Sequence, residues 1–133
     1  MRARVVILGA AFGGLELSSL LSAELAGKID VTLIDQSDSF IVRFSQLDAM
    51  SARRTMDEVR IRYRDIIVPG VTFRQELVLS VDPERMRVVT NAGVYDADVL
   101  VIAVGADMAP TAIPGLDALL PLDEACACGG VDQ

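Results

Sequence analysis

The sequence contains no histidine, no tryptophan and only two cysteines among its 133 residues. Without histidine, the chain has no histidine-based triad, no histidine proton shuttle and none of the usual zinc ligand sets. No apolar run approaches the length of a membrane span. The net charge of −7 argues against nucleic acid or an anionic membrane as a general partner. The remaining composition, 52% apolar and 23% charged, is typical of one compact α/β domain.

The two cysteines, Cys126 and Cys128, lie close together near the end of the chain. A disulfide between residues so close would be strained, and two thiols alone make a poor metal site. We therefore expect reduced thiols and a cytoplasmic location.

The first stretch has the order strand, tight glycine turn and helix. The apolar run Val5–Leu8 ends in Gly9, and a leucine-rich segment follows the turn. In the pattern G-x-G-x-x-G, Gly9 takes the first position and Gly14 the third, while Gly13 adds further room. Ala11 stands at the second position, where its methyl group is either tolerated or pushes a phosphate outward. This order presents backbone N–H groups to a dinucleotide pyrophosphate.

A second apolar run, residues 29–34, ends at Asp35, twenty-one residues after Gly14. An acidic residue there is placed to accept hydrogen bonds from the adenosine ribose, and it would repel a 2′-phosphate. The context favours a dinucleotide site over a purely structural βαβ unit. A signal peptide is the less favoured alternative for the first residues, because the glycine pair interrupts the apolar core and Glu16 and Glu24 follow.

The pattern predicts a helix over 14–26 that ends at Gly27. Its apolar face would consist of Leu17, Leu20, Leu21 and Leu25. Residues 40–47 have no clear hydrophobic periodicity. They form either a loop that lies over a ligand or a loop whose apolar side chains are buried in the domain.

Thr55 and Glu58 fit a helix-capping pattern. In residues 59–64 apolar residues alternate with arginines, which form either a phosphate patch or, more often, a solvated face. Tyr63, Ile66 and Ile67 could instead form the apolar side of a helix.

Short strands follow at residues 71–74, 76–81, 85–90 and 94–95, with a hairpin turn at 91–93. The apolar run 98–104 predicts a central strand buried on both faces, and Gly105 follows it. The order predicts an α/β, Rossmann-like, three-layer domain that is incomplete, with a parallel sheet and an antiparallel β-meander in place of a crossover helix.

Four segments, 5–15, 31–35, 95–105 and 113–115, resemble the amino-terminal part of the pyridine nucleotide-disulfide oxidoreductase superfamily. Residues 35–65 are most similar to its sulfide:quinone oxidoreductase and type II NADH dehydrogenase branch. The resemblance implies FAD as cofactor and NAD(P)H as a co-substrate of the complete enzyme. It also implies that complete relatives lie peripherally at the inner membrane face.

The resemblance also implies site residues. The pyrophosphate would be surrounded by Gly9, Ala11, Phe12, Gly13 and Gly14. Asp35 would hold the adenosine ribose, and the backbone of Val78 would meet the adenine. Ser45 would lie towards the flavin, and the cofactor would be closed over by Ala103, Val104 and Gly105. Catalytic and metal-binding residues are not implied. Val104 departs from the family, which usually has threonine there.

The resemblance places the cofactor-binding domain at residues 1–117 and an irregular tail at 118–133. The family's NAD(P)H or quinone-side domain and second FAD segment are not present in this sequence, so we expect a truncated chain. Some sulfide:quinone oxidoreductases carry a cysteine soon after the equivalent of Gly105, but free terminal thiols remain the favoured interpretation of Cys126 and Cys128.

Three hypotheses follow. The first is the FAD-binding segment of an oxidoreductase that passes electrons from NAD(P)H or sulfide to a quinone. The second is a non-catalytic module that binds NAD or an adenine nucleotide. The third is an inactive fragment whose exposed apolar surface favours self-association. The partner would be a dinucleotide, with a second copy or a complementary segment completing the domain.

Overall fold

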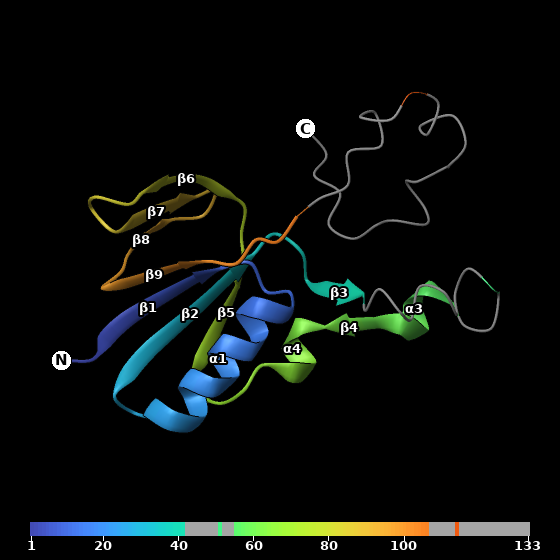
Figure 1. Ribbon diagram of the computed structural model, residues 1–133, viewed down its shortest axis with the longest axis horizontal. Helices are drawn as coiled ribbons and strands as arrows, with labels where there is room; N and C mark the ends of the chain where they lie inside the picture. The colour runs from blue at the N-terminus through green and yellow to red at the C-terminus, as the bar shows by residue number, and fades with distance from the viewer. Residues whose placement is uncertain (42–50, 52–54, 107–113, 115–133) are drawn as a thin grey trace. The chain divides into compact units, whose positions relative to one another are not determined.

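The computed structural model describes residues 1–41, 51, 55–106 and 114, and the chain divides into two compact units (Figure 1). The first unit comprises Met1–Asp38 and Arg62–Gly105. The second comprises Ser39–Ile61 and Ala106–Gln133. The fold of the first unit positions the candidate site.

A four-stranded parallel sheet forms the centre of the first unit. Its strands are β1 (Ala3–Leu8), β2 (Ile29–Asp35), β5 (Val71–Gln75) and β9 (Val99–Ile102), in the order β5-β2-β1-β9. The predicted βαβ unit is confirmed, since β1 and β2 are parallel neighbours joined through a helix. Parallel neighbours of this kind form the basis of a Rossmann-like fold.

The sheet lies between a helix and an antiparallel meander, which makes three layers (Figure 1). Helix α1 (Phe12–Leu25) packs against β1 and β2. The meander consists of β6 (Val78–Asp82), β7 (Arg87–Thr90) and β8 (Val94–Asp96). The core between the meander and the sheet contains Val6, Leu8, Ile34, Val88 and Ala97. This architecture confirms the α/β class and the meander expected from the sequence.

The face that α1 turns to the sheet is made of small residues. Gly14 and Ser18 are its buried positions, and the Ser18 hydroxyl donates to the carbonyl of Leu15 at 2.8 Å. The predicted leucine face is wrong at Leu20, whose side chain is 52% exposed. Because Gly14 and Ser18 are four residues apart, they lie on the same side of the helix and permit a close approach to the strands. The helix ends as predicted before Gly27, which has a φ of +77°.

Strand β9 does not match the prediction of a central strand buried on both faces. Val99 is 47% exposed and Ile102 is 62% exposed. The reason is its position, since β9 pairs with β1 and is an end strand of the four-stranded sheet that the structure describes. A continuous apolar run therefore does not by itself establish burial.

Residues 55–66 form short elements. Helix α3 (Met56–Val59) has the predicted capping box, in which Glu58 N–H donates to Thr55 Oγ1 and Thr55 N–H donates to Glu58 Oε2. Strand β4 (Arg60–Arg62) and helix α4 (Tyr63–Ile66) follow. The expected helix is therefore present but short, with Tyr63 buried and Ile66 38% exposed. Strand β3 (Ser39–Ile41), which pairs with β4, was not expected from the sequence.

Within the described part of the chain, no helix is both long enough and apolar enough to cross a membrane.

Candidate functional site

The carboxyl ends of three strands meet at one edge of the sheet. In the observed register, Leu8 of β1 is level with Ile34 of β2 and Ile102 of β9. The residues that follow are bonded across the strands: Gly9 N–H donates to the carbonyl of Ile34 at 2.8 Å, and Ala103 N–H donates to the carbonyl of Leu8 at 2.7 Å. Open α/β sheets bind their ligands at this edge.

Two glycines allow the backbone to pack closely at this edge. Gly9 has a φ of +95°, and a Cβ built there would lie against the backbone carbonyl of Ala103. A Cβ at Gly14 would overlap the Gly9 carbonyl and come within 3.2 Å of Leu33 Cδ1. At Gly13 the nearest atom is Ala103 Cβ at 3.8 Å, which is an ordinary contact. Gly9 and Gly14 are therefore required by the fold, whereas a side-chain Cβ at Gly13 would make only an ordinary contact.

Helix α1 begins without a capping side chain. Its N-cap is Ala11, with φ −70° and ψ −161°, and the first turn carries no acidic residue. Any residue adopts this conformation, so alanine at the second glycine position is compatible with the backbone. An uncapped helix N-terminus carries partial positive charge and N–H groups suited to an anion. Whether the Ala11 methyl group displaces a phosphate remains a prediction.

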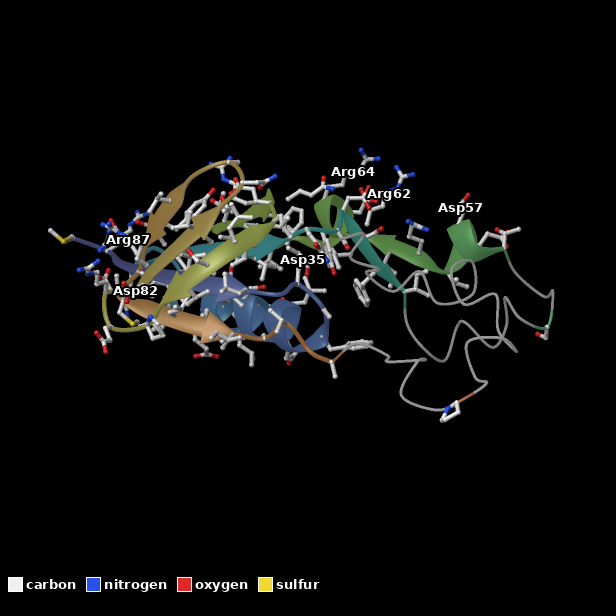
Figure 2. The ribbon with its side chains drawn as sticks, turned by 90° about the horizontal axis from the view of Figure 1, so that it is seen from above. Asp35, Asp57, Arg62, Arg64, Asp82 and Arg87 are labelled. Atoms are coloured by element: carbon white, nitrogen blue, oxygen red, sulfur yellow. The ribbon has the colours of Figure 1, made fainter. Side chains whose placement is uncertain are left out.

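Asp35 lies beside the glycine turn and is half-buried (Figure 2). Its Oδ2 accepts the N–H of Ala10 at 2.8 Å, and its Oδ1 accepts the N–H of Ser37 at 2.8 Å. A carboxylate offers about four acceptor positions, so both oxygens retain the capacity to accept ribose hydroxyls. Asp35 therefore orients the glycine turn in addition to its expected role towards a ribose. The sequence did not indicate this structural role.

A buried tyrosine supports the residues after Asp35. Tyr63 of α4 donates its backbone N–H to the carbonyl of Asp38 at 2.9 Å, and its ring centre lies 5.1 Å from that of Phe73. Burial raises the pKa of Tyr63 above its ordinary value, and the carboxylates of Asp35 and Asp38 raise it further. The phenol is therefore neutral at physiological pH. The negative charge at this end of the site comes from the two carboxylates, which disfavour a further phosphate.

The connection between β5 and β6 brings the predicted adenine residue to the same edge. Glu76 N–H donates to the carbonyl of Asp35 at 2.9 Å, and Val78, the first residue of β6, follows Glu76 by two residues in the chain. Glu76 was not among the residues that sequence analysis selected. A single glutamate at a strand end gave no signal that its backbone meets Asp35.

Two exposed apolar side chains accompany the turn. Phe12 is 61% exposed and Val104 is 68% exposed, and Gly105 after Val104 has a φ of +74°. Ligand sites combine apolar surface with a few oriented polar groups. The chain offers both kinds of group at this edge.

Some predicted residues are not placed at the site. Ser45, Cys126 and Cys128 lie outside the described residues. The side chains of Arg60 and Arg64 are exposed and form ion pairs with Asp57 at 3.9 Å and Asp65 at 3.7 Å. These pairs favour the interpretation of a solvated face over a phosphate patch.

A parallel sheet with a glycine turn, an uncapped helix N-terminus and an acid at the end of the second strand defines a dinucleotide-binding Rossmann-like domain. The sequence profile of the family described as pyridine nucleotide-disulphide oxidoreductase matches residues 3–129, and the chain belongs to this family. The resemblance noted in the sequence is thereby confirmed.

Curated relatives lie in the type II NADH:quinone oxidoreductase group. The protein from Staphylococcus haemolyticus is 32% identical over 124 residues, which cover 86% of this chain and 29% of that protein. The protein from Staphylococcus aureus (strain NCTC 8325) is 30% identical over 113 residues, covering 78% of this chain and 26% of that protein. The chain thus spans less than a third of the length of these relatives.

Solved structures show the same fold. The sulfide:quinone oxidoreductase of Aquifex aeolicus has a TM-score of 0.70 at 23% identity, covering 80% of this chain and 25% of that chain. NDH2 of Plasmodium falciparum in complex with NADH has a TM-score of 0.70 at 21% identity, covering 94% of this chain and 27% of that chain.

Proposed function

We propose that this chain is the FAD-binding segment of an oxidoreductase that transfers electrons from NADH to a quinone. The observation that carries the proposal is the convergence of the glycine turn, Asp35 and the end of β9 at one edge of the sheet, held by bonds of 2.7 to 2.8 Å. The curated relatives support NADH, in place of sulfide, as the electron donor and a quinone as the electron acceptor. Residues 1–117 would form the cofactor-binding domain, followed by a tail at 118–133.

The residues at this edge fit the cofactor in charge and space. The N-terminus of α1, with its uncapped first turn, suits the negative pyrophosphate. Asp35 would accept the ribose hydroxyls while it holds the turn through Ala10. The backbone of Val78 would meet the adenine, and Ala103, Val104 and Gly105 would line the path towards the flavin, together with Ser45.

FAD, when bound, supplies the electron-transfer chemistry, accepting two electrons as a hydride from a reduced nicotinamide. The chain's own contribution is to bind and orient the cofactor.

A second candidate function is a module that binds NAD or another adenine nucleotide without turnover. The features that favour it are Asp35 and the glycine turn, because they recognise the ADP portion that FAD and NAD share. In this case the same residues would bind the ADP portion, and Ala103, Val104 and Gly105 would lie towards a nicotinamide in place of a flavin.

Thermal unfolding in the presence of FAD, NAD⁺, NADP⁺ and ADP separates the two functions. At equal ligand concentration, a ligand that binds the native state raises the midpoint more the lower its Kd, with a logarithmic dependence. The proposal predicts the largest shift with FAD and the smallest with NADP⁺. A larger shift with NAD⁺ than with FAD would favour the second function, and no shift with any of the four ligands would refute both.

A further inference from the structure

The backbone of Val78 points towards the outer edge of the meander. Val78 of β6 is paired with Thr90 of β7, and the neighbouring Asn91 N–H donates to the carbonyl of Leu77 at 3.0 Å. In an antiparallel pair, residues that exchange bonds alternate with residues that do not. Because the neighbouring pair is bonded, the N–H and C=O of Val78 are directed away from β7. In the described three-stranded sheet, β6 is an end strand.

A donor and an acceptor on one residue complement one particular base edge. Adenine carries an amino donor at N6 and an acceptor at N1. A peptide carbonyl and N–H presented together match that pair. Hypoxanthine has a carbonyl at C6 and an N–H at N1, so it reverses both groups. The direction of the Val78 N–H and C=O therefore favours adenine over hypoxanthine at this position.

The position of Val78 depends on the residues just before it, and Glu76 fixes them to three other elements. Its N–H donates to the carbonyl of Asp35 at 2.9 Å. Its carboxylate accepts the hydroxyl of Tyr95 at 2.7 Å and the hydroxyl of Thr90 at 2.6 Å. Thr90 is buried and Tyr95 and Glu76 are half-buried, so these bonds are partly shielded from water. The connection from β5 to β6 is thus tied to β2, β7 and β8.

The side chain of Asn91 supplies a hydrogen bond between the start of β6 and the end of β7. Its side-chain Oδ1 accepts the N–H of Leu77 at 3.0 Å, while its own N–H donates to the carbonyl of Leu77. The pairing of β6 with β7 shifts register between Val78 and Ser80. Such irregularities recur beside functional sites, where they reorient a residue. One backbone bond and one side-chain bond from Asn91 therefore hold Leu77, the residue before Val78.

We propose that Glu76 and Asn91 are positioning residues that hold the backbone of Val78 to select adenine over other purines. The proposal rests on the proposed function, since it assigns the base of that same cofactor site. Neither side chain contacts the ligand in this account. Both act through the backbone of Val78.

The test compares the affinities of the full chain for ADP and for inosine diphosphate, measured by calorimetric titration. The variants are Glu76→Ala and Asn91→Ala, with Glu76→Gln as the conservative exchange. Asp96→Ala is the matched control, because it removes the bonds of 2.6 and 3.2 Å from Arg87 in the same meander without touching residues 76–78. The melting temperature of each variant is recorded alongside its two affinities.

Wild-type chain is expected to bind ADP at least about tenfold more tightly than inosine diphosphate. Each alanine variant should reduce that ratio about fivefold, the value of one hydrogen bond, with partial recovery in Glu76→Gln. Asp96→Ala should keep the ratio and change the melting temperature little, since the ion pair that it removes is exposed. A merely structural role would weaken both ligands equally, and an unchanged ratio in both alanine variants overturns the proposal.

The remaining outcomes are also decisive. A wild-type chain that binds the two diphosphates equally refutes the inference alone, whereas one that binds neither ADP nor FAD refutes the proposed function. If Glu76→Ala does not fold, Tyr95→Phe removes one of the two hydroxyl donors. That variant must then show a reduced ratio and weaker protection of the Val78 amide from hydrogen exchange when ADP is added, and wild-type values for both would overturn the proposal.

Discussion

Gly14 is the residue whose substitution the fold tolerates least. A Cβ at this position would overlap the Gly9 carbonyl and press on Leu33. We expect Gly14→Ala to lower the free energy of unfolding by about 3 kcal/mol, the upper range for overpacking a close contact. Urea denaturation followed by circular dichroism measures this change.

Gly13→Ala is the matched control for that prediction. It adds the same methyl group one residue earlier in the helix, with Ala103 Cβ 3.8 Å away. Alanine favours a helix over glycine by about 1 kcal/mol, so stability should be unchanged or slightly raised. Equal losses in the two variants would contradict the account of helix and strand packing.

Asp35 accepts hydrogen bonds from the backbone of the turn and, in the proposed function, from the ribose. The substitution Asp35→Asn tests whether these bonds, and not only the negative charge, are needed for binding. In Asp35→Asn the amide nitrogen cannot accept a hydrogen bond, so either Ala10 or Ser37 loses its acceptor. We expect affinity for ADP to fall about tenfold and the preference for NAD⁺ over NADP⁺ to narrow. Fluorescence competition titrations give both values.

Asp38→Asn serves as its control, because it removes the same charge nearby and leaves the acceptor of Ala10 in place. It should reduce the preference for NAD⁺ slightly and keep the affinity for ADP. An Asp35→Asn chain with wild-type affinity for ADP would show that the turn does not depend on this carboxylate.

The residues that sequence analysis could assign were those with a strict conformational or positional requirement. Gly9 and Gly14 follow from the order strand, turn and helix, and Asp35 follows from its place after the second strand. Glu76 and Asn91 could not be assigned, because their bonds join segments whose relative register the sequence does not contain. Ser18 was missed because a buried serine satisfied by Leu15 resembles an exposed helical serine in sequence.

Strands β1 and β9 are clamped at their starting ends by Arg4 and Asp98. The N–H of Arg4 donates to Asp98 Oδ2 at 2.7 Å, its guanidinium donates to Oδ1 at 3.1 Å, and Asp98 N–H donates to the carbonyl of Arg4 at 2.8 Å. These bonds fix the register that aligns Gly9 with Ala103 at the other end. The clamp therefore connects strand pairing to the geometry of the site.

The clamp predicts a dependence of stability on acid. The side-chain bond from Arg4 lowers the pKa of Asp98 below its ordinary 3.8, and the backbone N–H of Arg4 lowers it further. Because the folded-state pKa is depressed, the stabilisation is complete above the unfolded value and is lost as the pH falls through the folded value. Asp98→Asn should melt at a lower temperature than wild type at pH 6, and this difference should shrink as the pH falls below 3.8, the ordinary pKa of the carboxyl.

The control for the clamp is Asp30→Asn, which removes one bond of 3.3 Å between the exposed side chains of Asp30 and Arg2. It should change the melting temperature little at any pH, since exposed ion pairs contribute little. A difference between Asp98→Asn and wild type that stays constant from pH 6 to pH 2 would exclude the clamp as its cause.

The apolar runs and turn residues predicted which segments form strands, but they did not predict which strand faces are buried. The run 98–104 became the end strand β9, with Ile102 62% exposed, because burial depends on which strand lies alongside. The same limit applies to α1, whose buried face is decided by how closely it approaches β1 and β2.

The whole molecule is a member of the pyridine nucleotide-disulphide oxidoreductase family with a three-layer first unit. Its order of elements was foreseeable, because a βαβ unit followed by a meander and a parallel strand admits few arrangements. Electron donor and acceptor remain proposals, since the chain spans 29% of the relative from Staphylococcus haemolyticus.

The most direct test of the central claim is a titration of purified chain with FAD, followed by desalting and an absorbance spectrum. The account predicts saturable binding and flavin bands that stay with the protein, and both should be lost in Asp35→Ala. A chain that shows no saturable binding of FAD, or an Asp35→Ala variant that binds FAD as tightly as wild type, would contradict the assignment of the cofactor to this edge.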